Sequence, residues 1–422
     1  MRERRAPSMP KLALHPRTRA PLAEADPTSR QVPACWLVLL AAPVAASANG
    51  PVLILPGMAD SLGIPPPTAT WLVTVFAWAL AVGTPLMAGL LRRSGLNSTL
   101  RLSTALIMTG TALIAVAPWL PLALAGRAAQ AIGGAGLVIA AMSLAGSVRR
   151  MGLITAGFGT FGAAGPLIGS TLADLASWRM SLAVGTLALL AVPAIGRHAA
   201  TRSPAPPSAQ TASFDGRGAA LLIATVTALV LVPRHPLPAV AACTVTAALL
   251  AAHIRRHPMG FVPATLLRTR TFVLSALLAC ALATSYFALL FTVPRLLGDR
   301  TGWSAAAIGT GQLVALLAGS ALSMALTAVS ARMSRPRILA FLLTAAALAP
   351  CTALLTPWTP PLLLVATLAV FAASAGQATL AVWAAEAAPA AQRPTAIGLF
   401  NLCYQLGGAF GPALATLTTW GG

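Results

Sequence analysis

Residues 122–148 read LALAGRAAQAIGGAGLVIAAMSLAGSV and contain a single charged side chain, Arg127. Two arginines, Arg149 and Arg150, follow at once. An α-helix needs about 20 apolar residues to cross the hydrocarbon core of a bilayer, and its backbone groups must be paired within the segment. This stretch therefore predicts a membrane-spanning helix with a positively charged end.

The rest of the chain has the same character. Of its 422 residues, 57% are hydrophobic and 9% charged, with a mean hydropathy of +0.81. Soluble chains carry about 25% charged residues, so this one could not cover a water-facing surface. We predict an all-α polytopic membrane protein. Thirteen apolar segments are expected to cross the membrane: residues 34–55, 70–91, 102–120, 122–148, 152–172, 180–195, 218–232, 237–253, 271–293, 305–327, 338–355, 362–384 and 395–419.

Polar linkers divide these segments into groups. Residues 1–33 are basic and Pro-rich and predict a disordered cytoplasmic tail. Residues 34–196 predict an N-terminal bundle of six helices, and residues 271–422 a C-terminal bundle of five. Between them, residues 197–270 predict a linker with two short extra helices. Apart from hydroxyls this pair has no polar side chains to bury, so we expect it to be peripheral and to stay clear of any central cavity.

The basic residues that give the net charge of +20 lie mainly in the tail and in alternate loops between the apolar segments. With the N-terminus in the cytoplasm, 23 of the 28 Lys and Arg residues fall in the tail and the alternate loops on the same side. Cytoplasmic loops are enriched in Lys and Arg, so the sequence predicts a cytoplasmic N-terminus and a last segment that ends outside. The same scatter argues against a nucleic-acid partner. The Arg- and Ala-rich composition is typical of a high-GC bacterial genome, so we expect a multi-pass protein of a bacterial inner membrane.

Three stretches carry a resemblance to a known family. Residues 127–135 read RAAQAIGGA, residues 162–170 GAAGPLIGS, and residues 398–412 GLFNLCYQLGGAFGP. In this order they resemble the RxxQGxG, GPxxGG and penultimate-helix motifs of the major facilitator superfamily, in its fourteen-helix drug:proton antiporter branch. The resemblance implies a two-bundle fold, transport by alternating access, and conformational roles for the motif residues Gly133, Gly134, Gly165, Pro166, Gly169, Gly95 and Pro56.

The sequence also departs from that pattern. Arg92 stands where the loop motif of the family has an acid, and Ser47 where the branch has an aspartate. A fourteen-helix relative would have one more helix after Thr419, so the C-terminal bundle is expected to lack its last member, in a truncated chain or an unusual one.

Transporters of this type bind their substrate near the midplane, so polar groups deep in apolar segments are the candidate pathway residues. These are Asn49, Arg127, Gln130, Gln312, Gln377, Asn401, Tyr404 and Gln405.

Arg127 is the strongest candidate, because an isolated ion in lipid needs a cavity or a partner. Gln130 lies three residues on and shares its helix face. We expect the guanidinium to face the central cavity and to be needed for transport, with a small role in folding. The alternative is a structural arginine that binds helix-end carbonyls.

Acidic residues are scarce and lie at segment ends. Glu386 and Asp60 are the candidates for a proton-carrying carboxylate, and solvated loop residues are the alternative. Proton coupling needs a titratable carboxylate in a site of low dielectric constant, so the sequence leaves the coupling ion open. The five cysteines and five histidines show no ligand spacing, and neither a metal nor a cofactor is expected.

Together these features predict a transporter that exports hydrophobic or amphipathic small molecules, as in multidrug or natural-product efflux and drug resistance. The expected partners are the lipid bilayer, a small-molecule substrate and, as one option, protons; a monomer is expected. The alternatives are a facilitator or importer of a neutral or anionic solute, and a truncated member that does not transport. A membrane enzyme would place paired acids or histidines at the membrane face, and none occurs, so no enzymatic activity is expected.

Overall fold

The computed structural model describes residues 32–200, 215–232, 235–303, 305–355 and 360–417. Within these ranges every regular element is an α- or 3₁₀-helix. Residues 1–31 of the predicted tail and residues 201–214 and 233–234 of the predicted linker lie outside the described residues. The helices are α1 (Ala34–Asn49), η1 (Gly50–Leu53), α2 (Leu55–Leu62), α3 (Pro66–Ala69), α4 (Trp71–Val116), α5 (Leu120–Ala145), α6 (Val148–Leu175), α7 (Trp178–Leu182), η2 (Ala183–Ala191), α8 (Val192–Ala200), α9 (Gly216–Leu231), α10 (Pro236–Arg256), α11 (Ala264–Arg268), α12 (Arg270–Thr301), α13 (Ala305–Val329), η3 (Ser330–Arg332), α14 (Arg335–Leu355), α15 (Pro360–Glu386), η4 (Ala390–Gln392) and α16 (Arg393–Leu417).

Each predicted apolar segment is helical over most of its described length. Helix α4 holds two of them and is broken at Gly95, where φ is 76° and ψ is 180°. Glycine adopts such a backbone without steric cost, which allows the chain to turn back between two basic stretches. Among the described helices, nine are long and apolar enough to cross a membrane, while α1 and α9 are shorter apolar helices. The prediction of an all-α fold with many spans is confirmed.

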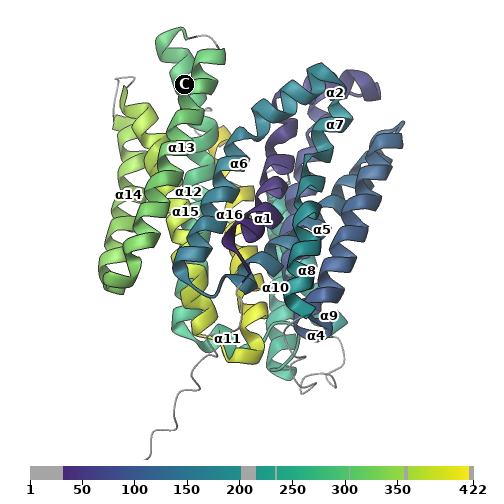
Figure 1. Cartoon of the computed structure of the whole chain (residues 1–422), viewed down its shortest axis with the longest axis vertical. Helices are drawn as coiled ribbons and strands as arrows, with labels where there is room; N and C mark the ends of the chain where they lie inside the picture. The colour runs from purple at the N-terminus through teal and green to yellow at the C-terminus, as the bar shows by residue number, and fades with distance from the viewer. Residues whose placement is uncertain (1–31, 201–214, 233–234, 304, 356–359, 418–422) are drawn as a thin grey trace, which may run out of the picture. The chain divides into compact units, whose positions relative to one another are not determined.

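The described helices form two groups that meet along a central seam (Figure 1). In the first group α5 packs on α4 and α6 packs on α1. In the second group α12 and α13 pack on α15, and α16 packs on α12. The groups contact each other mainly through α4 with α16 and through α6 with α13. The helix pairs that line this seam position the candidate site.

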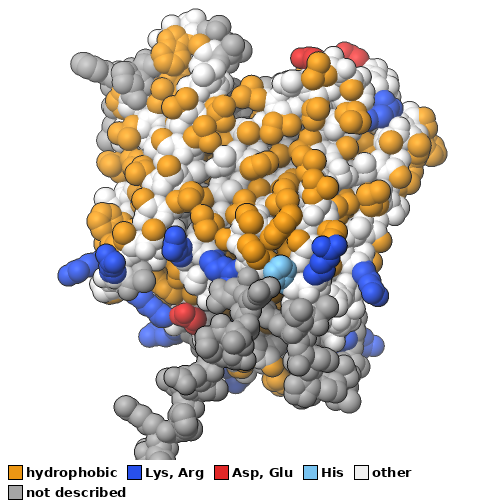
Figure 2. All heavy atoms as spheres, in the orientation of Figure 1, with side chains coloured by type: hydrophobic (Ala, Val, Ile, Leu, Met, Phe, Trp, Pro, Cys, Tyr) orange, Lys and Arg blue, Asp and Glu red, His pale blue; other side chains and the backbone are white. Residues whose placement is uncertain are grey.

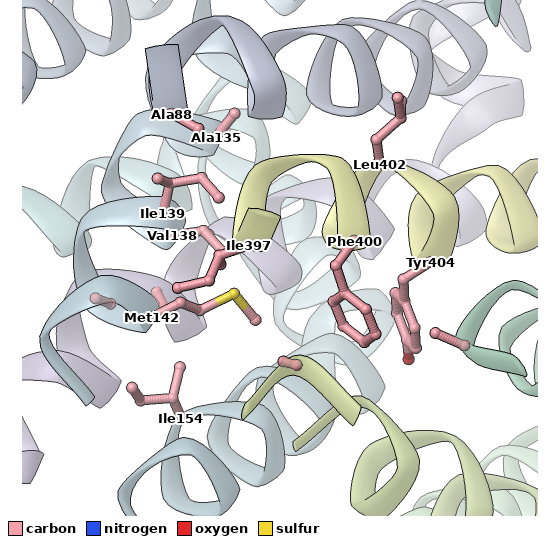
Figure 3. Packing of buried hydrophobic residues seen from close by; sticks show 14 of the residues in the cluster. Ala88, Ala135, Val138, Ile139, Met142, Ile154, Ile397, Phe400, Leu402 and Tyr404 are labelled. Atoms are coloured by element: carbon pink, nitrogen blue, oxygen red, sulfur yellow. The ribbon is translucent and has the colours of Figure 1, made fainter. Parts of the chain in front are cut away.

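The seam is closed near one end by a continuous apolar core. Figure 3 shows Val138 and Met142 of α5 beside Ile154 of α6 and Ile397 of α16. A Cβ at Gly398 would lie 3.3 Å from the Cα of Pro85, so α16 approaches α4 as closely as backbone permits. The arginines 92 and 93 follow this contact, just before the break in α4 at Gly95. Figure 2 shows most of the visible Arg side chains gathered along one edge of a broad apolar surface.

The linker helices α9 and α10 are tied together by one carboxylate at the start of α9. Asp215 accepts hydrogen bonds at 2.8 Å from the amides of Gly218 and Phe261, and its Oδ1 lies 2.8 Å from His253 Nε2 at the end of α10. Burial alone would raise the pKa of this carboxyl, but the bonds from Phe261, Gly218 and His253 outweigh it and hold the pKa below its ordinary value.

The lowered pKa of Asp215 gives a prediction for pH. A carboxyl with a depressed pKa stabilises the folded linker above the unfolded pKa of about 4 and loses that contribution as pH falls through the folded pKa. Asp215→Asn keeps one side-chain acceptor but loses the second acceptor and the charge, so it should weaken the linker by about 1 kcal/mol at neutral pH and by progressively less in acid. Faster hydrogen exchange at the Phe261 amide is the readout. The exposed Asp174→Asn is the control, and equal exchange in both variants at neutral pH would contradict the assignment.

Candidate functional site

A cavity of ≈ 470 Å³ lies in the seam between the two helix groups. Aromatic side chains supply much of its wall, and every described lining side chain is uncharged. The aromatic residues are Phe76, Trp78, Phe158, Tyr286, Phe287 and Tyr404. The polar residues include Asn49, Thr74, Thr155, Ser374, Gln377 and Gln405. A concave, mainly apolar wall with a few polar groups is the usual character of a small-molecule binding site.

The cavity occupies the middle of the helices and extends away from the basic end. On α4 the lining residues fall within residues 70–80, well before the arginines 92 and 93. Leu55 and Leu290, in the later parts of the first segment and of α12, lie at the same side. Because the core of Figure 3 closes the other half of the seam, this conformation has one closed end and one end with a cavity.

Amide side chains form the polar part of the wall. Asn49 Nδ2 donates to the carbonyl of Gly162 at 2.8 Å, which ties α1 to α6. Gln377 Nε2 donates to Asn401 Oδ1 at 3.0 Å, which ties α15 to α16. Asn401 does not itself line the cavity but orients the amide that does. Each pairing leaves the remaining amide atoms of Asn49 and Gln377 for a bound molecule.

Of the predicted pathway residues, Asn49, Gln377, Tyr404 and Gln405 line the cavity together. Gln312 does not line it, and its Nε2 donates to the carbonyl of Leu290, a lining residue, at 2.9 Å.

Arg127 lies behind the cavity wall. Its side chain is fully buried, and the guanidinium donates to the carbonyl of Ser47 at 3.1 Å, to Gln130 Oε1 at 3.1 Å, to Ser47 Oγ at 3.3 Å and to the carbonyl of Leu72 at 3.4 Å. The ring of Phe76 lies 4.0 Å from the guanidinium carbon and also lines the cavity. The prediction that this arginine faces the cavity is therefore wrong.

The physical reason is that α1 and α4 supply enough acceptors. Ser47 and Leu72 present carbonyls from two neighbouring helices, so the buried ion joins α1, α4 and α5 without needing water from the cavity. Gln130 completes the cluster, since its Nε2 donates to Thr111 Oγ1 at 2.9 Å and to the carbonyl of Leu182 at 3.1 Å. The sequence identified both members of this pair but gave no sign of their partners.

The motif glycines mark close helix contacts. A Cβ at Gly165 would lie 2.8 Å from the carbonyl oxygen of Ala46, and one at Gly169 would overlap the carbonyl of Gly50. The pair thus brings the backbone of α6 against α1 and η1, with Pro166 between them inside α6. Gly133 and Gly134 similarly face Ile107 of α4 and Val44 of α1, and Pro56 lies in the first turn of α2.

Neither candidate carboxylate lies at the cavity. Glu386 ends α15 and forms an ion pair of 2.9 Å with Arg335, and both side chains are more than half exposed. Asp60 is exposed on α2. In the described part of the chain, no three His, Cys, Asp or Glu residues come together as metal ligands would.

The sequence did not predict that Tyr286, Trp78 and the linker helix α9 would line the cavity. Apolar aromatic residues in apolar segments carry no signal that separates a cavity from a core, although Tyr286, one of only two tyrosines in the chain, could have been noticed. The expectation that neither linker helix lines the cavity is wrong for α9, whose Val230 does so. No described residue of α10 lines the cavity, and Ala239 is its one buried residue.

Known proteins of similar sequence or structure are transporters. A family model described as Major Facilitator Superfamily matches residues 35–418. The MFS transporter L2 of a Phoma species is 33% identical over 152 residues, which are 34% of this chain and 25% of that protein. An uncharacterized MFS-type transporter of Bacillus subtilis, YfiU, is 29% identical over 127 residues, 28% of this chain and 24% of that protein. The matched part thus spans about a quarter of each relative.

The fold is also found in a solved structure. The human organic anion transporter MFSD10 (TETRAN) superposes with a TM-score of 0.65 at 19% identity, over 93% of this chain and 94% of that one. The family match extends over nearly the whole described length. The all-helical fold of two groups with a central cavity is consistent with that match. The chain belongs to the Major Facilitator Superfamily.

Proposed function

We propose that this transporter exports hydrophobic or amphipathic small molecules that carry no net charge, by alternating access. The observation that carries the proposal is the cavity wall, which combines six aromatic rings with amides and hydroxyls and includes no charged side chain among its described residues. Rings bind large apolar surfaces with little loss of side-chain entropy, and the amides add orientation. A charged molecule would lose its hydration here without gaining an opposite charge.

We also propose that the N-terminus and the basic edge lie in the cytoplasm. The 23 basic residues on one side support this orientation. The cavity would then face the external side in this conformation, with the cytoplasmic half closed. A fluorescent or phosphatase reporter inserted in the loop after His257 should report a cytoplasmic location. A periplasmic signal at that loop would reverse the orientation, and with it the direction proposed for transport.

A second candidate is a facilitator that moves a neutral solute down its own gradient. The position of the acidic residues favours this facilitator. Glu386 is exposed and paired with Arg335, and Asp60 is exposed. Among the described residues, no carboxylate lines the cavity. Transport of an anion is less well supported. The similar human protein is an organic anion transporter, but the buried arginine of this chain lies behind Phe76 rather than at the cavity surface.

The test is a sensitivity screen in a bacterial host that lacks its own efflux pumps. The panel contains neutral, cationic and anionic hydrophobic compounds, and dye efflux is followed with neutral Nile red and cationic ethidium, with and without a pH gradient. We expect protection and efflux for neutral compounds. Loss of efflux when the gradient collapses would indicate proton coupling, persistence would favour the facilitator, and efflux of ethidium alone would contradict the proposed substrate class.

A further inference from the structure

The linker helix α9 differs from its partner α10 in how it is held. Trp78 Nε1 on α4 donates a hydrogen bond of 2.9 Å to Thr227 Oγ1 on α9. That hydroxyl in turn donates to the carbonyl of Ile223 at 2.7 Å, so its lone pair is directed at the indole. Helix α9 also contacts α16, whereas α10 packs on α9 and is otherwise exposed. Thus α9 lies between α10 and the two bundles.

The same hydrogen bond lies at the cavity. Val230 follows Thr227 by three residues and so shares its helix face. Both Val230 and Trp78 line the cavity, so the indole uses its N–H to hold α9 while its ring forms part of the wall. A wall made of an isopropyl group and an indole ring offers apolar contact and no charge.

The beginning of α9 is fixed as well. Asp215 caps the helix and binds the amide of Phe261. The ring of Phe261 is buried and would lie 3.4 Å from a Cβ at Gly89 of α4. Helix α9 is thus held against α4 near both of its ends.

We propose that α9 is part of the substrate site and that Val230 is a specificity-determining residue, positioned by the hydrogen bond between Trp78 and Thr227. This rests on the proposed function of the cavity. The helix limits the width of the cavity between α4 and α16, so the size of the side chain at position 230 sets the largest apolar group that the site accepts. Thr227 is a positioning residue that acts through the indole.

The first experiment measures geometry without any substrate. In a variant whose five cysteines are replaced by alanine, Val230→Cys is treated with a membrane-impermeant maleimide. Leu229→Cys, at the preceding residue of α9, which does not line the cavity, is the control. We expect Val230→Cys to react several-fold faster, and Ala77→Trp, which fills the cavity, to slow it. Equal rates at the two positions would overturn the proposal, whether or not the protein transports any tested compound.

The second experiment measures specificity. Val230→Trp should lose protection against the bulkiest neutral compounds and Nile red efflux while keeping the smallest compounds, and Leu229→Trp should resemble the wild type. Thr227→Val should shift the same size preference, whereas Thr225→Val should not, because Thr225 makes the same bond within the helix without an indole partner. An unchanged size profile in both Val230→Trp and Thr227→Val, at normal protein level, would overturn the specificity role.

Discussion

Arg127→Ala is expected to lower the free energy of unfolding of the purified transporter by about 3 kcal/mol. The change removes four hydrogen bonds, of which three join α5 to α1 and α4 and one, to Gln130, lies within α5. Such bonds are worth roughly 0.6 kcal/mol each between membrane helices, and the space left by a large buried side chain adds a cavity cost. Relief from burying the ion offsets part of this loss, since the structure pairs Arg127 with no carboxylate among the described residues.

Arg127→Lys should be destabilised as well. It keeps the charge, but an ammonium cannot reproduce the flat fork that reaches Ser47 and Leu72 together. Melting curves and the level of folded protein in the membrane are the readouts, with exposed Arg335→Lys as the control. Because the guanidinium lies against Phe76, we also expect transport per folded molecule to fall. A wild-type melting temperature in Arg127→Ala would show that the cluster does not hold the bundle together.

Gly169→Ala is expected to lower the free energy of unfolding by about 2 kcal/mol or more, although it adds only a single methyl group. That methyl would overlap the carbonyl of Gly50, and neither backbone can move without shifting η1 or α6. Overpacking a tight contact typically costs 1–3 kcal/mol. The membrane level of folded protein should fall, and the same substitution at Gly165 should act in the same direction, because its Cβ would lie 2.8 Å from the carbonyl oxygen of Ala46.

A matched control is available in the same bundle. Gly196 lies in α8, and a Cβ there would meet nothing within 4 Å. Since alanine favours helix by about 1 kcal/mol over glycine, Gly196→Ala should be neutral or stabilising. If Gly169→Ala behaved like Gly196→Ala, the close contact of α6 with η1 would not contribute to stability, and the GPxxG stretch would have to act in another way.

The fold could be predicted from the sequence because few backbone structures can cross a lipid bilayer. Long apolar runs must be helices, and arginines mark one side, so residues 122–148 and their neighbours could be placed without any contact information. The break in α4 falls between the predicted segments 70–91 and 102–120, but hydropathy alone did not assign it to Gly95, where φ is 76°. Helix lengths and order were predictable, whereas the way one helix faces another was not.

The site was predictable only for side chains whose polarity is costly in lipid. Asn49, Gln377, Tyr404 and Gln405 were found in this way and do line the cavity. The same rule selected Arg127, but its predicted position at the cavity was wrong. Backbone carbonyls of α1 and α4 accept its hydrogen bonds, so the buried ion does not need a cavity. Val230 and Trp78 are apolar or amphipathic in apolar segments, so their place at the cavity depends on tertiary packing that the sequence does not encode locally.

The most direct test of the cavity as the site of transport is to fill it. Ala77 lines the cavity and is exposed within it, so Ala77→Trp adds an indole without overpacking the core. Ala105→Trp, on the exposed side of the later part of α4, adds the same ring elsewhere. With protein levels and melting temperatures matched, Nile red efflux in the pump-deficient host should be lost in Ala77→Trp and retained in Ala105→Trp. Wild-type efflux from Ala77→Trp would contradict the assignment of this cavity as the substrate site.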